Sequence, residues 1–221
     1  VQINRNHRMS PQQGAPKTVR RAAVRGFNGG AMKRRTSQLI IACLFVVAVS
    51  VFPAGAVQVE GVRFEPVHRT ADQVLELSGA GLLRYMGFIK AYVGALYLPP
   101  GADPEDALSD TAKRLEVEYF HAIDGEDFGP ATIEGISRNV DDETLARLMP
   151  QIEYHNSLYV DVQPGDRYAL TYVPGRGTEL ALNGELRGII QGAEFAAALF
   201  SIWLGPEPVS KSFKSALLGK R

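Results

Sequence analysis

The sequence predicts an α+β domain in which an antiparallel sheet is packed against helices. Segments with the two-residue period of a strand follow one another across short Gly- and Pro-containing turns. Segments with helical spacing come in blocks instead of alternating with single strands, which argues against a parallel α/β protein. We find no internal repeat and no linker in residues 57–221, which we expect to form one domain.

The first half of this domain is expected to be mostly strand. The predicted elements are an edge strand over 57–68 that stops near Pro66, two strands over 74–98 joined at Ser78–Gly81, a short helix over 103–108 with Pro104 at its first position, and a strand over 114–121. The Gly79-Ala80-Gly81 segment is interpreted as a turn and not as a nucleotide-binding loop, because no helix follows it.

The second half is expected to contain both helices and strands. The predicted elements are a helix over 126–140, a second helix starting at the Asp141-Asp142 cap and breaking near Pro150, a hairpin of 166–173 and 178–182, a tight turn at Asn183-Gly184, a strand over 185–190, a helix over 193–203 ended by Gly205-Pro206, and a helix over 210–218.

The charge of the chain is segregated along the sequence. Residues 1–59 hold nine basic residues and no acid. Residues 60–221 therefore hold the remaining 15 basic residues and all 24 acids, which gives them a formal net charge of −9. A basic leader before an acidic body is typical of an exported protein. A net-negative body without a basic stripe argues against a nucleic-acid partner.

The leader has the parts of a secretory signal. Met32-Lys33-Arg34-Arg35 is a basic start, residues 39–52 are apolar, and Ala54-Gly55-Ala56 fits a cleavage site. We therefore expect residues 32–56 to be a signal peptide, cleaved after Ala56, and residues 1–31 to be an over-extended start or a disordered tail. The mature protein would be periplasmic. A retained anchor is the alternative, although the apolar run is shorter than the roughly 20 residues of a membrane span.

The only cysteine, Cys43, lies inside the apolar run. A lipid-modified Cys43 is a further alternative to simple cleavage. If the signal is removed, the mature chain has no thiol, and disulfides, cysteine nucleophiles and Cys-ligated zinc are excluded.

Few residues suggest chemistry. His68, His121 and His155 do not have metal-ligand spacing, and no serine lies in a nucleophile-elbow context, so we expect no metal and no cofactor. Glu116 and Glu118 share one face of a strand, which we interpret as a solvated outer face.

Arg84 is the exception. Strand alternation groups it with Leu82, Met86 and Phe88, and an arginine on an apolar face needs an anionic or hydrogen-bonding partner. That partner is either a structural salt bridge or the carboxylate of a ligand. Lys90 is either a second basic group on this face or a solvated rim lysine.

The chain resembles the chalcone isomerase-like family, in its bacterial exported branch. The resemblance is carried by residues 79–84, 90–98, 172–178, 195–205 and 208–210. It implies an open-faced β-sandwich, in which helices pack on one face of a long sheet and a ligand cleft lies between them. The family contains plant isomerases that close a flavanone ring, fatty-acid-binding members and non-catalytic members.

The resemblance also assigns positions in the cleft. The family arginine corresponds best to Arg84, and a threonine that orders substrate in the plant enzymes corresponds to Tyr92. The enzymes' tyrosine and asparagine fall on Phe128 and Gly135, which cannot donate a hydrogen bond to a ketone oxygen. The resemblance therefore implies that chalcone cyclisation is absent.

The predicted function is binding of a small apolar, fatty-acid-like carboxylic acid by Arg84, Lys90, Tyr92 and Phe128, with membrane contact only through an uncleaved signal. One alternative is an isomerase of the intramolecular-lyase type that uses Arg84 with Tyr85, Tyr92 or Thr132. Another is an interaction protein that binds a partner through residues 203–209 or the acidic surface, with its cleft filled by side chains.

Overall fold

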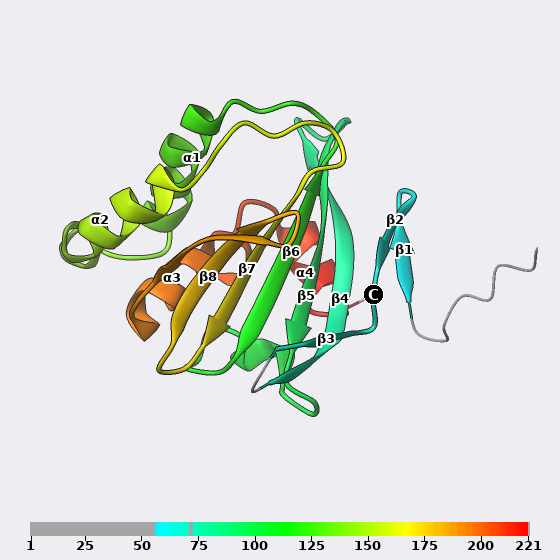
Figure 1. Ribbon diagram of the computed structural model, residues 1–221, viewed down its shortest axis with the longest axis horizontal. Helices are drawn as coiled ribbons and strands as arrows, with labels where there is room; N and C mark the ends of the chain where they lie inside the picture. Colours follow the sequence, from blue (N-terminus) through cyan, green and yellow to red (C-terminus); the bar gives the residue numbers. More distant parts are fainter. Residues whose placement is uncertain (1–55, 71–72, 221) are drawn as a thin grey trace, which may run out of the picture. The chain divides into compact units, whose positions relative to one another are not determined.

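The computed structural model describes residues 56–70 and 73–220, which belong to one compact unit. Seven antiparallel strands form its main sheet, and they lie in the sheet in the order of the chain (Figure 1). The strands are β3 (Val67–Arg69), β4 (Val74–Tyr85), β5 (Ile89–Leu98), β6 (Lys113–Tyr119), β7 (Arg167–Val173), β8 (Gly177–Leu182) and β9 (Glu185–Ile190).

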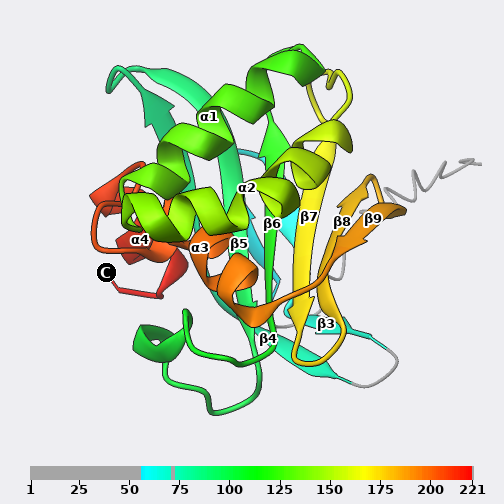
Figure 2. The ribbon, with the colours of Figure 1, turned by 90° about the vertical axis from the view of Figure 1, so that its left-hand side faces the viewer.

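Within the part of the chain that the structure describes, four α-helices cover one face of this sheet (Figure 2). They are α1 (Gly125–Ser137), α2 (Asp142–Ser157), α3 (Ala193–Leu204) and α4 (Lys211–Leu217), and a 3₁₀ turn, η1, covers Pro104–Asp106. The α+β class and the antiparallel sheet with helices on one face are therefore confirmed. None of the helices in residues 56–70 and 73–220 is long and apolar enough to cross a membrane.

The helix boundaries follow the local signals in the sequence. Asp141 caps α2 by accepting the backbone N–H of Thr144 at 2.7 Å, and Ser210 caps α4 through the N–H of Phe213 at 3.2 Å. The predicted break at Pro150 is wrong, because α2 continues to Ser157. Leu148 and Ile152 are buried on either side of the proline, so core packing holds both halves of the helix in line.

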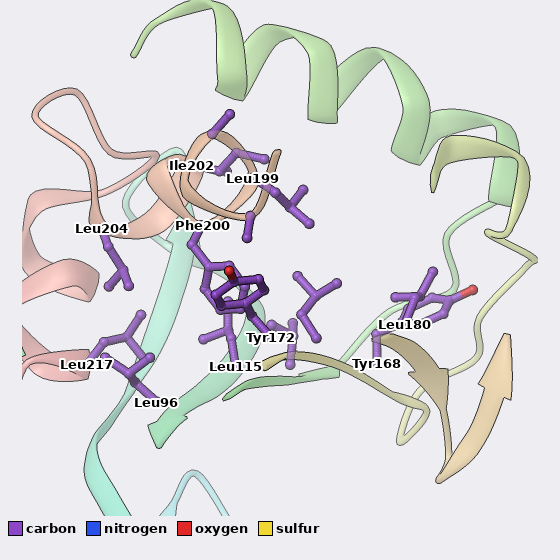
Figure 3. Packing of buried hydrophobic residues seen from close by; sticks show 14 of the residues in the cluster. Leu96, Leu115, Tyr168, Tyr172, Leu180, Leu199, Phe200, Ile202, Leu204 and Leu217 are labelled. Atoms are coloured by element: carbon purple, nitrogen blue, oxygen red, sulfur yellow. The ribbon is translucent and has the colours of Figure 1, made fainter. Parts of the chain in front are cut away.

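Two apolar clusters lie on opposite faces of the sheet. The cluster on the helix side, which we call the helix-side core, joins leucines and tyrosines of the strands to α3 and α4. Figure 3 shows Phe200 and Leu199 of α3 above Tyr172 and Leu115, and Leu217 of α4 beside Leu96. This packing fixes α3 against the strands.

The other face is covered by an N-terminal hairpin that the sequence did not predict. In place of one edge strand over 57–68, β1 (Val57–Val59) pairs with β2 (Val62–Phe64), and β3 starts after Pro66. Glu60 and Gly61 take φ angles of 51° and 90°, the left-handed backbone that a two-residue hairpin turn requires. Val62 and Phe64 of this hairpin pack in one cluster with Val93 and Tyr97 of β5.

The predicted turn at Ser78–Gly81 is also wrong. These residues lie inside β4, which reverses instead at Met86-Gly87-Phe88. The glycines are required by α4: a Cβ on Gly81 would lie 2.6 Å from the Cβ of Ala216, and one on Gly94 would lie 2.8 Å from Phe213. They allow a helix to lie directly on the backbone of the sheet.

Glu116 and Glu118 do not lie on a solvated face, contrary to the prediction. Glu116 is 7% exposed and pairs with Arg114 at 2.9 Å and with Arg167 at 2.9 Å. Arg167 also pairs with Glu118 at 2.7 Å, and its guanidinium lies over the ring of Phe64. The β1–β2 hairpin thus covers a cluster of ion pairs.

The second half of the domain matches the prediction closely. The β7–β8 hairpin, the Asn183-Gly184 turn, β9 and the helices at 193–204 and 211–217 all form where they are expected. The predicted tail and signal peptide lie outside the described residues, apart from Ala56.

Candidate functional site

A cavity of about 320 Å³ opens between the sheet and helices α1 and α3. Its volume lies at the lower end of the roughly 300–1,000 Å³ that small-molecule sites occupy. It is lined by Leu83, Tyr85, Ala91, Tyr92, Tyr119, Ile123, Asp127, Phe128, Ala131, Thr132, Tyr159, Ile202, Trp203 and Val209. The walls are therefore mainly apolar and aromatic, with a small number of polar groups.

Strand register brings part of this lining together. Leu83 of β4 lies opposite Tyr92 of β5, and Tyr92 lies opposite Tyr119 of β6. Directly paired residues point to the same face of a sheet. The three side chains thus form a row on the helix side, which α1 and α3 cover.

Tyr92 is held in place by α3. Its hydroxyl oxygen accepts a hydrogen bond from the indole N–H of Trp203 at 2.9 Å. Burial raises the pKa of Tyr92, although the bond from Trp203 opposes this, so the phenol stays neutral. The hydroxyl proton remains available for donation to a ligand.

Besides Tyr85 and Thr132, two further hydroxyl-bearing residues line the cavity, Tyr119 and Tyr159. Burial raises the pKa of both, and the Tyr159 hydroxyl forms a hydrogen bond with Thr132. The polar groups inside the cavity are therefore neutral at pH 7. Asp127 is the one acid in the lining, and it lies exposed at the rim.

Phe128 lines the cavity and packs against the rings of these two tyrosines. Its ring stacks on Tyr159 with centroids 4.6 Å apart, and it meets Tyr119 edge-on at 5.6 Å. Such aromatic pairs favour a rigid, apolar surface. The predicted ligand-binding residues Tyr92 and Phe128 therefore both line the cavity.

Arg84 and Lys90 do not line the cavity. Because Arg84 follows Leu83 in β4, its side chain points to the face of the sheet opposite the cavity. There Arg84 lies 3.8 Å from Glu60, and Lys90 pairs with the same carboxylate at 2.6 Å. The hydrogen bond from Lys90 lowers the pKa of Glu60. Ligand contact by Arg84 and Lys90 stays a prediction.

The position of Arg84 has a local cause. The expected grouping with Met86 and Phe88 assumed a strand that continued, but these two residues lie in the turn, where Met86 has a φ of 51°. Only Leu82 remains on the same strand face, and it packs on the cluster beneath the β1–β2 hairpin. Arg84 has a carboxylate partner there, as the salt-bridge interpretation expected.

The positions that correspond to the plant enzymes' catalytic pair have other roles. Phe128 is a cavity wall, and Gly135 is a packing position. A Cβ on Gly135 would lie 2.9 Å from two side-chain carbons of Ile202, so the glycine allows α1 and α3 to approach each other. Neither residue supplies a donor. Tyr85, Tyr92 and Thr132, which the isomerase alternative needs, do line the cavity, although Arg84 does not.

The interaction-protein alternative predicted a cleft filled by side chains. Trp203 and Val209 instead line an open cavity. Within residues 56–70 and 73–220 no three His, Cys, Asp or Glu side chains form a group that could hold a metal ion.

Sequence reasoning did not identify two of the cavity's tyrosines. Tyr119 shares a strand face with Leu115 and Val117, so its place on the helix side could have been inferred from alternation. Tyr159 lies after the end of α2, in a segment without periodicity that gives no such signal.

Comparisons with known proteins agree with this architecture. No curated protein matches the chain. Among solved structures, a crystal structure of a fatty-acid binding protein of Arabidopsis thaliana is similar, with a TM-score of 0.61 and 14% sequence identity, over 74% of this chain and 95% of that one. At this identity the likeness establishes the fold. The sequence model of the chalcone isomerase-like family matches residues 56–219, a range that includes every described residue except Lys220. The chain therefore belongs to the chalcone isomerase-like family.

Proposed function

We propose that the domain binds an elongated apolar molecule with one polar end, of the class of small fatty-acid-like carboxylic acids. The observation that carries this proposal is the open cavity, in which aromatic walls surround neutral hydroxyl groups. The similar plant structure is a fatty-acid binding protein, which supports an apolar ligand.

The polar end of the ligand is assigned to the hydroxyls of Tyr92, Tyr119 and Tyr159. A carboxyl group there would accept a hydrogen bond from Tyr92, whose oxygen already accepts one from Trp203. None of the residues that line the cavity is a lysine or arginine. Since burial without a cation disfavours a carboxylate, the cavity favours the protonated acid.

Burial of the ligand's hydrocarbon chain supplies the binding free energy. Each buried methylene contributes about 0.8 kcal/mol, against association costs of about 4–15 kcal/mol. An acid of about ten carbons gains about 8 kcal/mol in this way, so burial alone is expected to give an affinity of about 1 mM or weaker.

A titration with decanoic acid tests the proposal. Trp203 is the only tryptophan of the chain and lines the cavity, so its fluorescence reports occupancy. We expect a saturable change in emission, tighter for decanoic than for octanoic acid by about tenfold, and tighter at pH 5 than at pH 8. The absence of a saturable change at both pH values would contradict the proposal.

An isomerase of the intramolecular-lyase type is the second candidate, because neutral hydroxyls that converge in an apolar cavity can polarise a carbonyl group. Phe128 and Gly135 argue against cyclisation of a chalcone itself. Loss of a chalcone's visible absorbance on incubation with the protein would show that cyclisation remains in spite of these two residues. Turnover that Tyr92→Phe abolishes would favour the enzyme.

We also propose that the domain acts in the periplasm after cleavage behind Ala56. Support comes from the basic start at residues 32–35, the apolar run at 39–52 and the fact that the family match begins at residue 56. The test is the intact mass of protein from a periplasmic extract. A mass that begins at Val57 is expected, whereas an unprocessed or lipid-bearing protein in the membrane pellet would refute cleavage.

A further inference from the structure

The tip of the β4–β5 hairpin exposes a group of large apolar side chains. Tyr85, Met86 and Phe88 are 62%, 69% and 70% exposed, and Ile89 is 37% exposed. Met86 and Gly87 take positive φ angles of 51° and 79°, so the chain reverses sharply and presents these side chains outward. The hairpin projects at the upper left of Figure 2.

A protein partner does not suit this surface well. A specific protein interface buries about 800 Å² on each partner, and a narrow turn with four apolar side chains offers much less. A tip of this shape can instead enter the boundary between lipid headgroups and acyl chains, where aromatic and other apolar side chains bind.

The charges behind the tip fit the same partner. Arg84 and Lys90 are paired across the two strands directly behind the tip, and both side chains are partly exposed. Glu60 neutralises only one of the two cations. The remaining positive charge would lie at the depth of the lipid phosphates when the apolar tip is inserted.

The tip adjoins the cavity. Tyr85 is both an exposed residue of the tip and part of the cavity lining. A bilayer that holds the tip would therefore lie close to the mouth of the cavity, where an apolar molecule could pass between the two without crossing much water.

We propose that residues 85–89, with Arg84 and Lys90 behind them, are a docking site for a lipid bilayer. The docking site depends on the exposed side chains and the charge of the tip, so it can be tested independently of ligand affinity in the cavity.

The first test is partitioning onto vesicles of phosphatidylcholine with a minor share of phosphatidylglycerol, measured by sedimentation. The acidic body, which has a formal charge of −9 after residue 59, makes a strongly anionic vesicle unsuitable. We expect Phe88→Asp to lower the partition coefficient about tenfold. Leu186→Asp is the matched control, because Leu186 is 54% exposed in β9, away from the tip; it should change partitioning less than about twofold. Both variants keep residues 1–55, so the apolar segment there cannot produce the difference.

A second test locates the contact. On a Trp203→Phe background, Phe88→Trp should shift its emission to shorter wavelength when vesicles are added, and Leu186→Trp should not. Equal partitioning of Phe88→Asp and wild type, or an unshifted Phe88→Trp, would overturn the proposal. So would reversible self-association, in the absence of lipid, that Phe88→Asp abolishes, since the tip would then bind a second copy.

Discussion

Trp203 of α3 donates its indole N–H to the hydroxyl oxygen of Tyr92 in β5 at 2.9 Å, and so ties a helix to the sheet across the cavity wall. The bond orients the hydroxyl that we assign to the ligand and places the chain's single tryptophan beside it.

Tyr92→Phe should weaken binding of decanoic acid about two- to tenfold, since one neutral hydrogen bond contributes about 0.5–1.5 kcal/mol. The same change leaves the indole N–H of Trp203 without its acceptor and should lower the free energy of unfolding by about 1 kcal/mol. Both are measured by Trp203 fluorescence, in titration and in urea. Tyr154→Phe, at an exposed tyrosine of α2, is the control and should change neither.

Arg84→Ala distinguishes two interpretations of this residue. An arginine clamp would make the variant bind the acid more weakly by about 1.5–3 kcal/mol, the range of a charged hydrogen bond. The pairing of Arg84 with Glu60 on the other face of the sheet predicts an affinity within about twofold of wild type. The titration at pH 8, where the acid is ionised, decides between them, with Arg138→Ala as a distant control at an exposed arginine.

His155 should make stability depend on pH. Its ring is fully buried, and burial lowers its pKa to about 4. The unfolded chain, with a pKa near 6.5, binds the proton first as the pH falls. The contribution is therefore fully present above about pH 6.5 and is lost toward pH 4, on the order of 3 kcal/mol.

Urea unfolding at pH 7.5 and pH 4.5 measures this effect. His155→Phe should lose less stability between the two pH values than wild type does, because it removes the titrating imidazole. The neighbouring rings of Tyr159 and Phe195 can accept another aromatic side chain, so the variant is expected to fold. His121→Gln, at an exposed histidine, should follow wild type. Equal losses in His155→Phe and wild type would contradict the assignment.

Glu116→Ala should destabilise the domain by about 3–5 kcal/mol, because it leaves Arg114 and Arg167 without their shared carboxylate beneath the β1–β2 hairpin. Glu194→Ala removes the exposed pair with Arg147 and should cost less than about 1 kcal/mol. The comparison is made by urea unfolding at neutral pH. Similar small losses in both variants would show that the cluster is solvated in solution.

Gly94→Ala should cost about 1–3 kcal/mol, because the new methyl group would lie 2.8 Å from the ring of Phe213 and 3.0 Å from a backbone oxygen of Glu116. Gly129→Ala is the matched control. It adds the same methyl group inside α1, where Asn156 lies at an ordinary 3.5 Å, and should stabilise the helix by up to about 1 kcal/mol. Thermal unfolding of both variants provides the measurement.

The fold class and the second half of the domain could be predicted because their signals are local. Asn183-Gly184 specifies a tight turn, and Asp141 and Ser210 cap the helices that follow them. Residues 78–81 could not be predicted in the same way. A glycine pair favours a turn, but here it serves α4, whose Ala216 lies far along the chain. Local sequence does not reveal that contact.

The site was partly predictable for the same reason. Tyr92 and Phe128 were found through the resemblance, and both line the cavity. Arg84 was placed by a strand period that the turn at Met86 interrupts. The buried state of Glu116 depends on Phe64 and Val62, which come from another hairpin. Alternation along one strand cannot show which face is covered by a distant segment.

The β1–β2 hairpin makes the first residues of the domain part of its stable structure. Its residues, 57–64, follow directly after the predicted processing site and also shield Arg167 and Glu116 from water. Shortening the chain by these eight residues is therefore not a neutral trimming of a tail. If an exopeptidase removed the residues up to Phe64, the ion pairs would become hydrated and the side chains of Val93 and Tyr97 would be exposed to solvent. A recombinant protein that starts at residue 65 would therefore have a lower free energy of unfolding than one that starts at Val57.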